Sequence, residues 1–155
     1  AIEMLCGRAP DNLWLKWPND LWFGSGKLAG ILTESCLSGP LLRVVTGVGI
    51  NLAPLKSDNI MSACIGDFAA NPGPERLLGL FCLAYDEIAE LPVATLCGLW
   101  TKAARQFWEK SFLVSEPGAT AWVGRPVCLE CDGSLVLADE KGLQKTVVSA
   151  TLQIL

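Results

Sequence analysis

The sequence predicts an α+β fold in which a β-meander is followed by two helices and then by a second, smaller β region. Residues 12–53 consist of short apolar or alternating runs separated by Gly, Pro, Asn and Ser, a pattern typical of strands joined by tight turns. Between residues 74 and 112 the apolar residues recur at helical spacing instead. After residue 112 short β-like runs return, separated by clusters such as Asp-Gly.

The first β region is expected to be a meander of antiparallel neighbours. Pro18-Asn19, the Gly-Ser-Gly at 24–26 and the Ser-Gly-Pro at 38–40 are turn signals. The run after the last of these turns, LLRVVTGVGINLA, is β-branched and mostly apolar, which is typical of a buried strand. The expected strands are 12–17, 20–23, 27–37 and 41–53.

Two helices are expected next. The first begins at Pro74 and ends before Pro92, because proline suits a first helical turn and cannot continue a helix. The second continues without a break over residues 93–112. Each places apolar residues on one face: Leu77, Phe81, Ala84, Ile88 and Leu91 in the first, and Leu96, Leu99, Ala103 and Phe107 in the second.

Residues 113–155 are expected to form a small barrel or sandwich, and residues 1–112 the main domain. The segment VSEPGATA at 114–121 is the expected linker between them. A β domain of this size buries little apolar surface on its own, so we expect it to pack on the first domain.

Composition excludes several classes of function. The chain has 155 residues, is 51% hydrophobic and 18% charged, and carries a net charge of −4 without any basic run, which disfavours nucleic-acid binding. No apolar run is long enough to span a membrane. The seven scattered cysteines favour reduced thiols in a cytoplasmic protein.

The absence of histidine narrows the chemistry further. It rules out a nucleophile activated by histidine, and the single Cys-x-x-Cys, Cys128 to Cys131, has no second pair with which to hold a metal. We therefore expect no metal site. Gly47 and Gly49 are more informative, because two glycines one residue apart on a strand leave one face flat. That face suits a ligand or a close backbone, although a bulge has the same pattern.

Three motifs, in order and at matching spacing, resemble the biotin protein ligase family: KWPND at 16–20, KLAGIL at 27–32 and GVGIN at 47–51. GRPVCLE at 124–130 resembles the start of that family's small C-terminal domain. The resemblance implies the C-terminal half of a class II synthetase-like catalytic core, with a mixed or antiparallel sheet and helices, followed by a shortened SH3-like β domain.

The resemblance also implies a reaction. Such enzymes activate biotin with MgATP to biotinyl-5′-AMP and pass the biotinyl group to one lysine of a biotin carboxyl carrier domain. Lys27 matches the lysine between the biotin carboxylate and the phosphate, where a positive charge lowers the repulsion between two anions. Asp20 matches the residue that orients or deprotonates the acceptor lysine.

The remaining matches are binding residues. Gly30, Leu32, Gly47 and Gly49 match positions that line the biotin pocket together with Lys27, while Lys16, Asn19 and Asn51 match positions near the nucleotide. Each also has a structural explanation: a lysine after a Gly-rich hairpin is commonly solvated, and Asn and Asp often cap turns.

The family's Gly-Arg-rich loop, which folds over biotinyl-AMP, has no match upstream of KWPND. We therefore expect the chain alone to have little activity unless an N-terminal half complements it. Two alternatives stay open: a non-catalytic binding or interaction module that forms a dimer or takes a partner, and a lipoate ligase-like protein.

Overall fold

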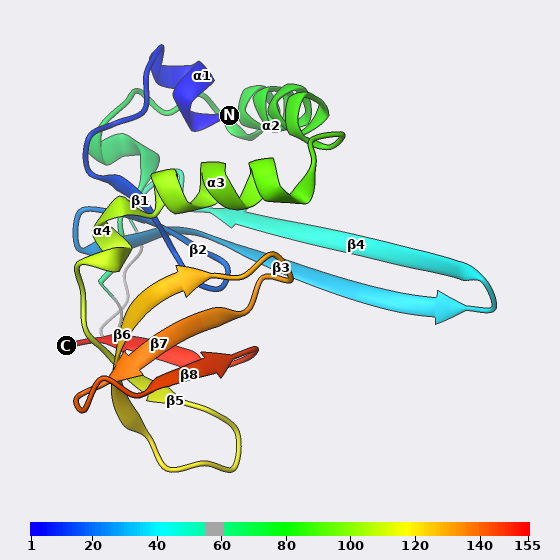
Figure 1. Cartoon of the computed structure of the whole chain (residues 1–155). Coiled ribbons are helices and arrows are strands. Elements are labelled where there is room, and N and C mark those ends of the chain that lie inside the picture. Colours follow the sequence, from blue (N-terminus) through cyan, green and yellow to red (C-terminus); the bar gives the residue numbers. More distant parts are fainter. Residues whose placement is uncertain (55–60) are drawn as a thin grey trace. The chain divides into compact units, whose positions relative to one another are not determined.

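The computed structural model describes residues 1–54 and 61–155 (Figure 1). The chain divides into two compact units. The first consists of Ala1–Leu13 and Asn19–Ala84, and the second of Trp14–Pro18 and Tyr85–Leu155. The predicted α+β class is confirmed, because helices and antiparallel sheets both occur. No helix in the described part of the chain is both long and apolar enough to cross a membrane.

The predicted meander is present. The strands of the first sheet are β1 (Leu13–Lys16), β2 (Asp20–Phe23), β3 (Gly26–Ser38) and β4 (Leu41–Ile50), in the order β1-β2-β3-β4. β3 pairs antiparallel with β2 on one side and with β4 on the other. The turns lie where Gly-Ser-Gly and Ser-Gly-Pro predict them, and Gly24 and Gly39 have positive φ angles there.

The core of the first unit lies at the inner end of this sheet. Leu28 and Ile65 are fully buried, Ile65 opening the 3-10 helix Ile65–Asp67. Ile2 of helix α1 (Ile2–Cys6) packs in the same cluster. The partly buried side chains around it come from several elements: Leu5, Cys6, Leu13, Leu21, Phe23, Ile50, Leu52, Phe68 and Ala69. Burial of these side chains fixes the start of β3, where Lys27 lies.

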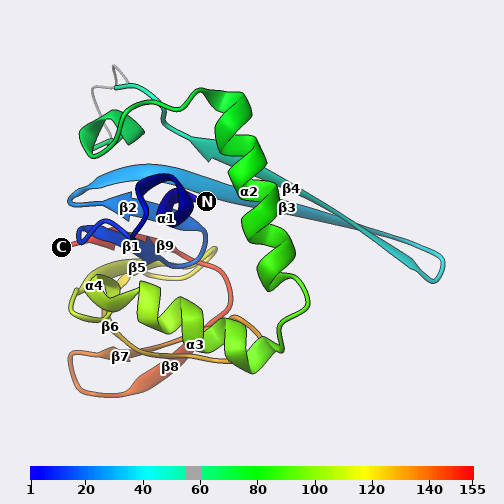
Figure 2. The ribbon, with the colours of Figure 1, turned by 90° about the horizontal axis from the view of Figure 1, so that it is seen from above.

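The outer part of the β3–β4 hairpin is exposed, so the prediction that residues 41–53 form a buried strand is wrong for most of its length. The first seven residues of β4 are exposed, Val45 at 69%. Figures 1 and 2 show both strands reaching past β2 as a long two-stranded ribbon. Nothing in the described part of the first unit covers this ribbon. An apolar sequence indicates that a strand can be buried, but it does not show whether another element covers the strand.

Helix α2 (Pro74–Ile88) crosses the inner half of β4 (Figure 2). Of its predicted apolar face only Leu77 is buried. An apolar groove of about 280 Å³ lies between helix and strand. Its lining residues are Thr46, Val48, Ile50, Leu52, Pro74, Leu77, Leu78 and Phe81.

The second unit contains two helices where a single helix over residues 93–112 was predicted. α3 (Val93–Ala103) and α4 (Arg105–Trp108) are separated at Ala104, which is fully buried. The Trp108 indole N–H donates to the Thr101 carbonyl at 3.0 Å, which provides a partner for that carbonyl near the end of α3. No residue of α3 is buried, whereas Phe107 of the expected stripe is fully buried and packs on Phe112.

The second sheet has the strand order β8-β7-β6-β5-β9. Its strands are β5 (Phe112–Ser115), β6 (Trp122–Leu129), β7 (Leu135–Asp139), β8 (Gln144–Val147) and β9 (Thr151–Ile154). The prediction that VSEPGATA is a linker between two domains is wrong. Its first two residues belong to β5, which pairs with both β6 and β9, and the rest connects β5 to β6. The SH3-like character and the boundary at residue 112 stay predictions.

A prediction follows from Gly26. A Cβ atom there would lie 2.7 Å from the backbone of Ser62 and Ala63, closer than atoms can pack. We expect Gly26→Ala to lower the free energy of unfolding by about 1–3 kcal/mol, measured by urea denaturation. Gly49→Ala is the matched control, because no atom lies within 4 Å of its Cβ position. Equal stability of the two variants would contradict the close approach.

Candidate functional site

A hollow of about 440 Å³ lies on the inner part of the first sheet. Its volume falls within the range of small-molecule pockets. Segments of β3 and β4 and the turn before β2 line it, which are the segments that carry the three sequence motifs. The lining residues are Asn19, Lys27, Gly30, Ile31, Leu32, Gly47, Val48 and Gly49.

Two glycines of the hollow leave space that the protein does not fill. A Cβ atom at Gly49 would meet no atom within 4 Å, and one at Gly47 only the Leu32 carbonyl oxygen at 3.8 Å. Gly49 and Gly47 stand opposite Gly30 and Leu32 in the β3–β4 register. Internal packing therefore does not require glycine at 47 or 49, whereas a flat ligand lying against the backbone would.

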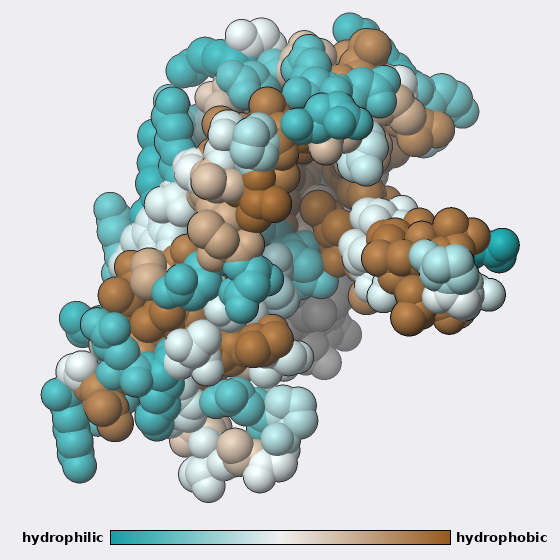
Figure 3. Space-filling model, turned by 45° about the vertical axis from the view of Figure 1, so that its right-hand side comes forward, coloured by the Kyte–Doolittle hydropathy of each residue, from teal (hydrophilic) through white to brown (hydrophobic). Residues whose placement is uncertain are grey.

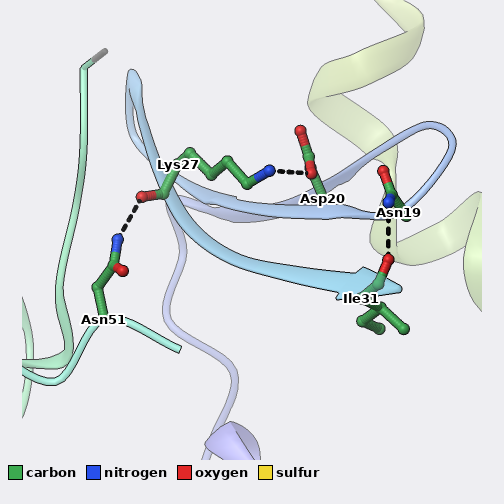
Figure 4. Close-up of polar contacts among 5 residues, drawn as sticks. All are labelled: Asn19, Asp20, Lys27, Ile31 and Asn51. Carbon is green, nitrogen blue, oxygen red and sulfur yellow. Dashed lines mark hydrogen bonds and ion pairs between the residues drawn. The ribbon is translucent and has the colours of Figure 1, made fainter. Parts of the chain in front are cut away.

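Lys27 and Asp20 form an ion pair beside this hollow. The Lys27 Nζ lies 2.5 Å from Asp20 Oδ1, and the two side chains are 39% and 13% exposed (Figure 4). Gly30 makes room for the pair, because a Cβ atom there would lie 3.2 Å from Nζ. An ammonium held at the rim of an open hollow can exchange its carboxylate partner for the anionic group of a ligand.

Asn19 holds the rim on the other side of Asp20. Its side-chain amide donates to the Ile31 carbonyl at 2.7 Å, and the Ile31 N–H donates to the Asn19 carbonyl at 2.9 Å (Figure 4). This double contact joins the start of β2 to the middle of β3. The Asn-Asp pair thus has one member fixing the strands and the other pairing with Lys27.

Both the backbone N–H and the backbone carbonyl of Lys27 are hydrogen-bonded. Its N–H donates to the Met61 carbonyl, and its carbonyl accepts from the Ala63 N–H, both at 2.9 Å. The Asn51 side-chain amide donates to the same Lys27 carbonyl at 3.1 Å and to the Ala63 carbonyl at 3.0 Å. The segment 61–63 was not singled out from the sequence, since it has no motif or periodicity.

The other predicted residues lie elsewhere. Asn51 is half-buried and does not line the hollow. Lys16 is buried on the part of β1 that belongs to the second unit. Ile31 and Val48, which line the hollow, were missed as individual residues although both lie inside motifs. The roles assigned to all these residues stay predictions.

The Cys-x-x-Cys lies in the second unit, and its thiols are free. Desolvation and the Glu130 carboxylate raise the pKa of Cys128. Desolvation and the neighbouring Cys131 raise the pKa of Cys97. Hydrogen bonds from Ser134 lower the pKa of Asp132. A raised thiol pKa favours the unreactive protonated form, and in the described ranges no group of three His, Cys, Asp or Glu could hold a metal.

Comparison with known proteins finds a family match for the segments that line the hollow. Residues 5–51 match the model of the biotin/lipoate A/B protein ligase family. A stretch of 54 residues is 50% identical to the biotin–[acetyl-CoA-carboxylase] ligase of Paracoccus denitrificans, covering 34% of this chain and 22% of that one. Over these residues the chain is similar to biotin ligases.

Further relatives agree. A stretch of 52 residues is 44% identical to the bifunctional ligase/repressor BirA of Escherichia coli, covering 33% of this chain and 16% of that protein. The chain thus spans about a fifth of the length of the curated relatives it matches.

Solved structures match over nearly the whole chain. The biotin protein ligase of Aquifex aeolicus without ligand superimposes with a TM-score of 0.74 at 20% identity, covering 99% of this chain and 69% of that one. The same ligase in complex with biotin and ATP gives a TM-score of 0.71. At 20% identity this structural similarity establishes the fold alone. The similarity covers residues well beyond the segment that carries the three motifs.

The ion pair yields a second prediction. Because Lys27 is partly exposed, its pair with Asp20 should contribute little to stability. We expect Asp20→Asn to change the free energy of unfolding by less than about 1 kcal/mol, measured by urea denaturation. Asp11→Asn, which breaks the exposed pair with Arg8, is the control. A loss of about 3 kcal/mol or more would show that Asp20 serves the fold.

Proposed function

We propose that this chain carries part of the active site of a biotin protein ligase, which activates biotin with ATP and transfers the biotinyl group to a lysine of a biotin carboxyl carrier domain. The observation that supports this most is the hollow: two glycines leave its floor open, and the Lys27 ammonium lies at its rim. The three segments that build it are those that match the family.

In the first step an oxygen of the biotin carboxylate bonds to the α-phosphorus of ATP, and the bond from that phosphorus to pyrophosphate breaks. Both reactants are anions, and negative charge grows on the phosphoryl oxygens. Lys27 lowers this repulsion when its ammonium leaves Asp20 for the carboxylate and the phosphate. Gly30, Leu32, Gly47 and Gly49 share one face of the β3–β4 pair and contact the fused rings of biotin, and Ile31 and Val48 contribute only their backbone there.

In the second step the amine of the acceptor lysine attacks the acyl carbon of biotinyl-5′-AMP, and the bond to AMP breaks. The amine must lose a proton to form the amide. Asp20, released from Lys27 once that ammonium faces the phosphate, accepts this proton or orients the amine. Asn19 and Lys16 contribute to the nucleotide site, as does Asn51 through its side-chain oxygen.

Magnesium is expected with ATP in this reaction. The described residues do not provide a ligand set for it. Mg²⁺ bound to nucleotides is held mainly by phosphates and water, and no step above depends on a protein-bound ion.

The cysteines support a cytoplasmic setting, because all seven are free thiols. Biotin is favoured over lipoate as the substrate because the named relatives are biotin ligases.

The exposed β3–β4 ribbon is the surface on which the remainder of a ligase core packs. The strand order leaves the outer edge of β4 unpaired within the described sheet. Figure 3 shows apolar side chains gathered on the ribbon. The most exposed of them are Leu32, Leu37, Leu42 and Val45. The relatives contain residues beyond the matched part, and the motif resemblance implies core segments upstream of KWPND, so we propose a polypeptide corresponding to the family's N-terminal part as the occupant. A second copy of the chain is the competing occupant.

The reaction gives a third prediction. Lys27→Met should slow the biotin-dependent release of pyrophosphate from ATP on the order of 100-fold or more, since one charge that stabilises the transition state is lost. The assay contains the N-terminal part of the Paracoccus ligase as the complementing chain. Lys141→Met, in an exposed turn, is the control. Equal rates for the two variants would overturn the role of Lys27, and no release by the wild-type mixture would overturn the proposed activity.

The partner surface gives a fourth prediction. Light scattering should detect a one-to-one complex of the chain with the same N-terminal part, and Val45→Glu should abolish it by placing a charge on the apolar ribbon. Val148→Glu is the matched control, because Val148 is an exposed valine of the second unit. A homodimer that excludes the added chain would contradict this assignment.

A further inference from the structure

Asn51 uses its side-chain amide inside the protein. Its Nδ2 donates two hydrogen bonds, to the Lys27 carbonyl at 3.1 Å and to the Ala63 carbonyl at 3.0 Å. An amide nitrogen has two hydrogens, so both are engaged. Unless one of these hydrogen bonds breaks, the Asn51 side chain can therefore bond to a ligand only through its oxygen.

The backbone of Asn51 is bonded to the same region. Its N–H donates to the Leu28 carbonyl at 3.0 Å, and its carbonyl accepts from the Ile65 N–H at 2.9 Å. Asn51, the residue after β4, is thus bonded both to the start of β3 and to the segment 63–65. Since the Ala63 N–H also donates to the Lys27 carbonyl, three segments meet at one carbonyl.

These bonds fix the point from which the Lys27 side chain starts. From there the Lys27 side chain passes over Gly30, and its ammonium reaches Asp20 (Figure 4). A long flexible side chain places its charge reproducibly only when its Cα is held and its path is defined. Gly30 defines the path, and Asn51 holds the start.

We infer that Asn51 is a positioning residue for Lys27: its amide, bonded to the Lys27 and Ala63 carbonyls, holds the backbone from which the ammonium reaches the hollow. The inference rests on the proposed function for what Lys27 then does. It differs from a nucleotide contact, because the effect of Asn51 passes through Lys27.

Asn71 offers a matched comparison. It lies in the same unit, its side-chain amide donates to the Leu52 carbonyl at 3.3 Å, and its oxygen accepts from the Gly73 N–H at 2.9 Å. It therefore makes the same kind of contact without touching Lys27, and Asn71→Ala reports what the loss of such a contact costs by itself.

The first test needs no ligand. Hydrogen exchange of the wild-type chain, Asn51→Ala and Asn71→Ala is followed at the Lys27 and Ala63 amides. We expect Asn51→Ala to accelerate exchange at both on the order of 10-fold, and Asn71→Ala to leave both unchanged. Unchanged exchange in Asn51→Ala would overturn the inference, as would equal acceleration by the two variants.

The second test is a double-mutant cycle with Lys27→Met, using biotin affinity measured by calorimetry. Asn51→Ala should weaken binding about 10-fold to 100-fold when Lys27 is present, and less than about 2-fold in the Lys27→Met background. Equal losses in both backgrounds would overturn the inference and indicate a direct or general role. If the wild-type chain binds no biotin in the presence of the complementing N-terminal part, the proposed function fails, whereas hydrogen exchange still decides whether Asn51 holds Lys27.

Discussion

The site depends on the anchoring of one lysine. The Lys27 backbone is hydrogen-bonded to Met61, Ala63 and Asn51, while its side chain lies over Gly30 toward Asp20. Gly26 permits this arrangement, because only a residue without Cβ lets the segment 61–63 approach so closely. A cation on a four-carbon chain is otherwise a poorly defined charge. Anchoring turns it into a fixed charge beside the hollow, and both steps of the proposed chemistry depend on that position.

Glycine serves two different purposes within this one sheet. At positions 26 and 30 the protein itself occupies the space that a side chain would take. At positions 47 and 49 that space stays open toward the hollow. The first pair of glycines makes room for residues 61–63 and for the Lys27 side chain, and in the proposed function the second pair makes room for a ligand. Lys27 and Asp20 form an ion pair beside this hollow. In the proposed reaction an anion takes the ammonium and leaves the carboxylate available as a base.

Much of this could be predicted from the sequence because the signals are local. The Gly-containing turns and the alternating runs define the meander, and the three motifs bring Lys27, Gly30 and Gly47 to one place since antiparallel neighbours keep register. What failed depends on tertiary context. The apolar run of β4 is typical of a buried strand, yet nothing in the described part of the first unit covers its outer half. The helix break at Ala104 is accompanied by a hydrogen bond from the Trp108 indole to the Thr101 carbonyl, a tertiary contact that the helical spacing does not reveal. The segment 61–63 has no sequence motif or hydrophobic periodicity, and it holds Lys27 only through backbone hydrogen bonds.

Biotin binding to the wild-type chain and to Gly49→Val, measured by calorimetry together with urea denaturation, tests the central claim most directly. We expect wild-type binding to be weakened about 100-fold or more by Gly49→Val, because the added side chain fills the open floor, while the free energy of unfolding changes by less than about 1 kcal/mol. Unchanged affinity, or no binding by the wild-type chain in the presence of its complementing part, would contradict the assignment of the hollow to biotin.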